Sequence, residues 1–198
     1  MTLTLTLVVL GRDTHDLSVV RAIEADEVIL LSNPEAKFGG LSKIGNWYLD
    51  HSRGDVVGLI HADVVLSHCA SYQLAESALK NGLSGIVGKS LETGNSVWGY
   101  NVDPGMEVLV STLDSCAVFI RRNSCLRFDV ETFDSFHMCV EDLCLQAGHN
   151  HLKVVVPNVI ACHLPTEDRP DREFWRQEHT RYLLRLKEKW AGTEFSTC

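Results

Sequence analysis

Short apolar segments return at intervals along the chain, and several of them are followed by a segment with helical periodicity. Residues 2–10 alternate Thr and Leu before becoming fully apolar, and residues 27–32 and 55–60 are further apolar runs. Such runs are typical of strands that become buried on both faces. Strands that alternate with helices indicate βαβ units and parallel strand pairs. The sequence therefore predicts an α/β fold in a single domain over residues 1–198, with a mostly parallel central sheet flanked by helices.

Turn residues and periodicity predict the other elements. Ser42 is a candidate N-cap for a helix that ends at residue 51, and Gly82 ends a helix that begins at Ser67. Residues 91–106 are rich in Gly and Asn and have no clear period, so we expect irregular structure there. Further strands are expected at residues 84–88, 113–121, 152–156 and 159–163, and a further helix over residues 141–147.

The C-terminal segment, residues 171–191, has the pattern of an amphipathic helix. Its large apolar residues fall near one helical stripe and charged residues fill the other positions. We expect this helix to pack on the domain, with a role as a lid or partner-docking element as the alternative. The stripe consists of Phe174, Trp175, Tyr182, Leu183, Leu186 and Trp190.

Composition excludes several classes of protein. With 45% hydrophobic residues the chain is too apolar for a disordered tail. A formal net charge of −8 argues against a protein that binds duplex nucleic acid by neutralising many phosphates. It does not argue against a small anionic ligand, because one bound cation can reverse the local field. Oligomeric state is left open.

The cysteines and the apolar segments bear on location. Seven cysteines at irregular spacing, without a CxxC pair, suit a reducing compartment better than a disulfide framework. Residues 1–10 lack the basic region and cleavage site of a signal peptide, and no apolar run reaches about 18 residues. We therefore expect a cytoplasmic protein without a transmembrane segment, whose contact with any membrane is peripheral.

Polar residues follow the predicted strands, at the points where ligands collect in α/β sheets. Gly11 follows the first strand, Asn33 the second, and the motif His61-Ala62-Asp63 the third. If the chain stays extended there, the imidazole and the carboxylate point to the same side and can bind one divalent cation. The alternative is that Asp63 caps the next helix and His61 forms a local hydrogen bond.

Two other groups carry candidate chemistry. Glu141 and Asp142 stand at the start of a predicted helix, where acids also serve as caps or partners of the helix dipole. His163 follows a late strand and is either a ligand or a structural histidine.

Taken in order, these features resemble the family 2 glycosyltransferases of the GT-A fold, in the subgroup where His-x-Asp-Val replaces Asp-x-Asp. Four blocks over roughly residues 4–190 carry the likeness, and their order and spacing are more specific than any one block. The first block comprises residues 41–46, 54–55 and 61–64, and the second runs from residues 113–115 to residues 121–122. The third comprises residues 127–129, 136–137 and 142–147, and the fourth comprises His163 with residues 174–175 and 189–190.

The resemblance implies a metal-dependent inverting transferase that uses a nucleotide-diphosphate sugar, most simply a UDP-sugar, and a hydroxyl acceptor such as a glycan. It implies Mn²⁺ or Mg²⁺ held by Asp63 and His163, with His61 as a third ligand or a contact to the donor. Asp142 is the first candidate for the base, and Glu141 is the second. Relatives often carry the base two positions before Asp142, where this chain has Val140.

Val140 at the position where relatives often carry the base leaves an alternative function open. The protein would then be catalytically inactive and would bind a nucleotide sugar or a glycan. Two other enzyme classes are disfavoured, because the sequence lacks the GxGxxG turn of a dinucleotide-dependent oxidoreductase and the HExxH spacing of a zinc hydrolase.

The resemblance also implies contacts to the two substrates. The implied donor contacts are Gly11, Arg12, Asn33, Lys43, Asn46 and Ala62, and the implied sugar or acceptor contacts are Asp114 and His137.

Overall fold

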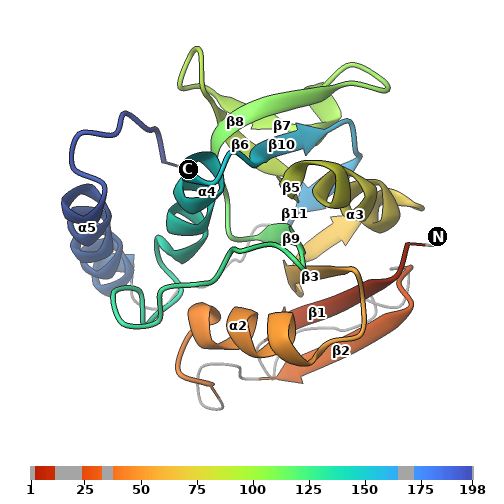
Figure 1. Ribbon diagram of the computed structural model, residues 1–198, viewed down its shortest axis with the longest axis horizontal. Helices are drawn as coiled ribbons and strands as arrows, with labels where there is room; N and C mark the ends of the chain where they lie inside the picture. Colours follow the sequence, from red (N-terminus) through yellow and green to blue (C-terminus); the bar gives the residue numbers. More distant parts are fainter. Residues whose placement is uncertain (1–2, 12–23, 33–37, 165–171, 198) are drawn as a thin grey trace.

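A computed structural model describes residues 3–11, 24–32, 38–164 and 172–197 (Figure 1). These residues form a nine-stranded sheet in the order β2-β1-β3-β9-β5-β10-β8-β6-β7, and β11 and β4 form a second, two-stranded sheet. The strands are β1 (Leu5–Gly11), β2 (Glu27–Ser32), β3 (Val56–His61), β4 (Val64–Leu66), β5 (Gly82–Gly85), β6 (Val87–Ser90), β7 (Ser96–Trp98), β8 (Glu107–Leu113), β9 (Ala117–Arg121), β10 (Lys153–Pro157) and β11 (Ala161–His163).

The α/β class is confirmed, but the expectation of a mostly parallel sheet is wrong, because the large sheet is mixed. β1 runs parallel to β2 and β3, and β5 runs parallel to β10. All the other pairs of that sheet are antiparallel. The cause lies in the connections of the middle segment. From β5 to β9 the chain contains no α-helix, and a parallel connection needs a crossover of a dozen residues or more.

Helices cover both faces of the sheet. One core joins α2 and α4 to one face through residues such as Val8 and Leu59, and the other joins α3 to the opposite face through Leu7 and Ile60. Since successive side chains of a strand point to opposite faces, β1 feeds both cores and all seven of its residues are buried. The helices are α2 (Leu41–His51), α3 (Ala70–Asn81), α4 (Cys139–His149) and α5 (Arg172–Lys189), with a 3₁₀ turn η2 (Gly99–Asn101).

The predicted helices at residues 42–51, 67–81, 141–147 and 171–191 correspond to α2, α3, α4 and α5, with ends shifted by up to three residues. The segment expected to be irregular, residues 91–106, contains only the short β7 and η2. None of the helices in the described ranges combines the length and the apolar character needed to cross a bilayer.

Helix α5 packs on the domain, as the apolar stripe predicts. It lies beside α4 in Figure 1, and its Tyr182 and Leu186 are buried in the same core as α4. The Tyr182 hydroxyl also donates a hydrogen bond to Asp134. Only part of the stripe is used, because Phe174 remains about half exposed at 52%.

The packing of α2 gives the first prediction. A Cβ at Gly45 would overlap the ring of Phe128, whereas a Cβ at Gly148 of α4 would meet no atom within 4 Å. Gly45→Ala should therefore lower the free energy of unfolding by about 1–3 kcal/mol. Gly148→Ala, the matched control, should raise it by roughly 0.5–1 kcal/mol through helix propensity. Urea unfolding of both variants measures this, and equal effects would contradict the packing described.

Candidate functional site

The His61-Ala62-Asp63 segment is the turn between β3 and β4. Two backbone hydrogen bonds hold it: the amide of His61 donates to the carbonyl of Cys116 at 2.9 Å, and that of Ala62 donates to Leu10 at 2.9 Å. The turn is thereby tied to the carboxyl end of β1 and to the link between β8 and β9. Ala62 is buried at 4% exposure, while the side chains of His61 and Asp63 are only partly buried.

His163 reaches this turn through the antiparallel pairing of β11 with β4, which places His163 opposite Val64. The amide of Leu164 donates to the carbonyl of Asp63 at 2.8 Å and extends the pairing to the turn itself. As a result, Nε2 of His163 lies 3.2 Å from Oδ1 of Asp63, and the His61 and His163 rings meet edge-on with centroids 6.1 Å apart. The three residues predicted as metal ligands thus lie together.

Their chemistry suits a divalent metal. One ligand atom from each of His61, Asp63 and His163 lies within 4.8 Å of the other two. Burial acts to raise the pKa of Asp63, but the hydrogen bond from His163 and the positive potentials of His163 and His61 outweigh it and lower that pKa. The carboxylate is therefore ionised at neutral pH. Two imidazoles and one carboxylate fit a transition metal such as Mn²⁺ better than Mg²⁺, which prefers oxygen ligands.

An acidic pair, Asp114 and Glu141, borders the same turn. Asp114 begins the link between β8 and β9, where its Oδ1 accepts the amide of Cys116 at 2.8 Å. Glu141 lies in the first turn of α4 and is 6% exposed. Burial raises the pKa of Glu141 to about 8, its own amide opposes this, and the negative charge of Asp114 adds to the rise. Cys116 connects Asp114 to the turn, because its amide donates to Asp114 and its carbonyl accepts the amide of His61.

Asp142, the first candidate for the base, has a different task. Its side chain is fully buried. Oδ1 accepts the indole N–H of Trp190 at 2.7 Å and lies 2.8 Å from Nζ of Lys189, and Oδ2 accepts Nε2 of Gln146 at 2.7 Å. A carboxylate with these three partners and no exposure has no way to reach an acceptor hydroxyl. Asp142 therefore anchors the end of α5 to α4.

Asn46 also has a structural task in place of the implied donor contact. Its Nδ2 donates to the carbonyl of Phe128 at 2.8 Å, and its Oδ1 accepts the amide of the same residue at 2.8 Å. Both polar atoms of the amide are thus used to hold one backbone unit against α2. Neither Asp142 nor Asn46 could be assigned from the sequence, because Trp190, which donates to Asp142, and Phe128, which holds Asn46, lie 48 and 82 residues away.

The other implied contacts fall in three places. Gly11 ends β1 and is buried opposite Ser32 of β2, at the same strand ends as His61. Lys43 is exposed on α2. His137 lies against α5, with ring centroids 5.2 Å from Trp175 and 5.8 Å from His179. Arg12 and Asn33 lie outside the described residues.

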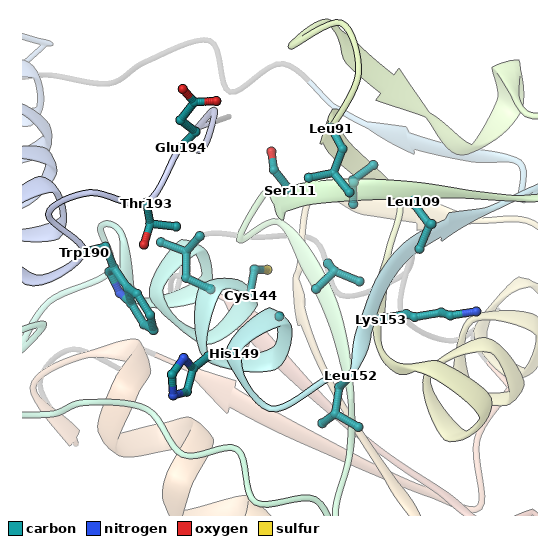
Figure 2. Close-up of a pocket in the computed structure, with 14 residues that line it drawn as sticks. Leu91, Leu109, Ser111, Cys144, His149, Leu152, Lys153, Trp190, Thr193 and Glu194 are labelled. Atoms are coloured by element: carbon teal, nitrogen blue, oxygen red, sulfur yellow. The ribbon is translucent and has the colours of Figure 1, made fainter.

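A pocket of about 410 Å³ lies elsewhere, between α4, β8, β10 and the segment that follows α5 (Figure 2). Its lining is mainly apolar and includes Leu109, Leu152 and Trp190, with Cys144 on the α4 side. None of the predicted site residues lines it. This pocket and the predicted site residues are thus separate features of the chain.

Comparison with known proteins identifies no family for this chain. No protein-family model matches the chain, and no curated protein matches it. Among solved structures, the crystal structure of A197 from STIV is similar, with a TM-score of 0.49 and 16% sequence identity over 82% of this chain and 86% of that chain. A likeness of this strength carries no argument about function, so the site must be interpreted from this chain's own residues.

The buried Glu141 predicts an unusual dependence of stability on pH. Its folded-state pKa of about 8 lies above the ordinary 4.5, so the folded protein binds a proton that the unfolded chain has released. The contribution of Glu141 to stability is therefore full below pH 4.5 and is lost as the pH rises toward 8.

Replacing the acid with Gln should remove this loss. Relative to the native chain, Glu141→Gln should gain stability between pH 5 and pH 8, as measured by urea unfolding at each pH. Glu92→Gln, at an exposed position in the loop between β6 and β7, is the matched control and should leave the pH dependence unchanged. If the free energy of unfolding of Glu141→Gln varied with pH in parallel with that of the native chain, the pKa of Glu141 would not be raised by folding.

Proposed function

We propose that the protein is a metal-dependent inverting glycosyltransferase of the GT-A fold, which moves a sugar from a nucleotide-diphosphate donor to an acceptor hydroxyl. One observation carries the proposal. His61 at the end of β3, Asp63 in the turn that follows and His163 of β11 converge at the carboxyl end of β3, and Asp114, whose charge acts on Glu141, is linked to the same turn through Cys116. A ligand-binding site at this edge of an α/β sheet is the usual arrangement.

The donor side of the proposed site rests on the metal ligands. Asp63, His163 and His61 would hold a divalent cation, and their two imidazoles suit a first-row transition metal better than Mg²⁺. When bound, such a cation stabilises the negative charge that develops on the departing diphosphate. Gly11, at the end of β1, leaves the neighbouring strand end without a side chain that could block the donor.

The acceptor side rests on Glu141. A general base works best when its pKa lies near the working pH, and the pKa of Glu141 is about 8. In the proposed step, a Glu141 oxygen takes the proton of the acceptor hydroxyl. At the same time the hydroxyl oxygen attacks the anomeric carbon, and the bond between that carbon and the diphosphate breaks. Asp114 raises the proton affinity of Glu141 through its charge and so strengthens it as a base. Asp142 holds α4 and takes no part in proton transfer.

A protein that binds the donor without transferring its sugar is the second candidate. It is favoured by the low exposure of Glu141, which is 6%, and by the fully buried Val140 at the position where relatives often carry the base. In that case the metal ligands would hold a nucleotide sugar, and the acidic pair would only shape the site. Measurement of binding and of turnover on the same variants separates the two functions.

The experiment combines thermal melting with a turnover assay, using a panel of nucleotide sugars with Mn²⁺. A donor that binds only the folded state raises the melting temperature, and Asp63→Asn should abolish that rise because it removes the charged ligand. Glu141→Gln should keep the rise but lower sugar transfer or donor hydrolysis by roughly 10²–10⁴-fold.

One control variant and three contrary outcomes make the experiment decisive. Glu92→Gln, an exposed replacement of the same kind, should leave both measurements unchanged. A melting rise that survives Asp63→Asn would overturn the donor site, as would a panel in which no nucleotide sugar has any effect. Donor binding without turnover in the native chain would leave the binding protein as the function.

A further inference from the structure

A second group of metal-ligating side chains lies at the start of α3, apart from the residues described above. Glu24 stands three residues before β2, and His68 and Cys69 immediately precede α3. Nδ1 of His68 lies 2.8 Å from Sγ of Cys69, and Nε2 of His68 lies 3.0 Å from Oε1 of Glu24. One ligand atom from each of the three residues lies within 4.8 Å of the other two.

Hydrogen bonds from the neighbouring side chains of Ser71 and Tyr72 hold together the two segments that carry this cluster. The hydroxyl of Ser71, in the first turn of α3, donates to the carbonyl of Glu24. The hydroxyl of Tyr72 donates to Oδ2 of Asp26 at 3.2 Å. These two hydrogen bonds join the segment before β2 to the start of α3, so Glu24 faces His68 and Cys69 independently of any contact among the three.

Cys69 has a backbone conformation that a side chain rarely adopts. Its φ of 63° and ψ of −5° lie in the left-handed region, which costs a residue with a Cβ on the order of 1 kcal/mol. Such strain is commonly retained where a side chain must point in a particular direction. Here the conformation turns Sγ toward the imidazole of His68.

The three ligand types together select a particular class of metal. Thiolate, imidazole and carboxylate are the ligands of Zn²⁺, with bonds of about 2.0–2.3 Å, and ligand atoms around a tetrahedral zinc are therefore roughly 3.5 Å apart. Cys69 contacts Nδ1 of His68 and Glu24 contacts Nε2, so a bound ion takes one of these nitrogens and the side chain beside the other nitrogen must turn toward the ion. The side chain of His68 is 81% exposed, which leaves room for water in a fourth position.

A nucleophilic cysteine is the competing interpretation, because the order Cys69, His68, Glu24 is that of a nucleophile, a base and an acid that orients the base. The surroundings oppose it. The side chain of His68 is 81% exposed and Cys69 is exposed as well, so the thiol does not face an enclosed cleft that would orient a substrate against it. A cation, by contrast, can bind the three side chains at the surface with water as a further ligand.

We propose that Glu24, His68 and Cys69 bind one Zn²⁺, with water completing a tetrahedral site. The bound ion would join the segment before β2 to the start of α3. This site is distinct in chemistry from that of His61, Asp63 and His163, because a thiolate is among its ligands. The proposal does not depend on the glycosyltransferase assignment.

Titration of the metal-free chain with Co²⁺ tests it, since a cobalt–thiolate bond produces a charge-transfer absorption that nitrogen and oxygen ligands do not. The native chain should show this absorption, and one equivalent of Zn²⁺ should remove it. Cys69→Ser should abolish the absorption. His68→Asn should weaken Zn²⁺ binding at least about tenfold, because even indirect partners of a ligand contribute 10–100-fold.

Three controls complete the experiment. Cys125→Ser and Cys162→Ser replace two other exposed cysteines and should leave the absorption intact. Asp63→Asn should also leave the absorption intact, which separates this site from the first.

A second test variant does not depend on the folding of Cys69→Ser. Glu24→Gln retains both His68 and Cys69 and should weaken Zn²⁺ binding. No absorption in the native chain, or full absorption in Cys69→Ser, would overturn the proposal.

Discussion

The short antiparallel pairing of β11 with β4 is the interaction on which the candidate site depends. It places His163 opposite Val64, and the Leu164 amide extends it to the carbonyl of Asp63. Without that pairing, His61 and Asp63 would be a polar turn after a buried strand, with no third ligand. Its three backbone pairs convert two side chains that are common at strand ends into a cluster that a divalent cation can join.

The first turn of α4 serves both the fold and the proposed chemistry. Glu141 and Asp142 are adjacent, but successive residues of a helix point about 100° apart. Asp142 consequently faces Lys189 and Trp190 of the C-terminal segment, while Glu141 is close enough to Asp114 to have its pKa raised by that charge. The docking of α5 thus holds Asp142 in place and with it the turn that carries Glu141.

Periodicity and turn residues predicted the helices and the three parallel strands at one side of the sheet, because those elements depend on local sequence. The mixed direction of the remaining strands depends on long-range pairing and was missed. The same limit applies to the site. The order of motifs correctly grouped His61, Asp63 and His163, but Trp190, which contacts Asp142, and Phe128, which contacts Asn46, lie far along the chain and left no local signal.

The central claim is that a divalent cation binds between β3 and β11 and holds a nucleotide diphosphate. Crystals grown with Mn²⁺ and UDP, with diffraction data collected at a wavelength where manganese scatters anomalously, test it most directly. The account predicts one strong anomalous peak within coordination distance of Asp63 and His163, and diphosphate density beside it. The absence of an anomalous peak at these ligands, or bound UDP with an unbroken contact between His163 and Asp63, would contradict it.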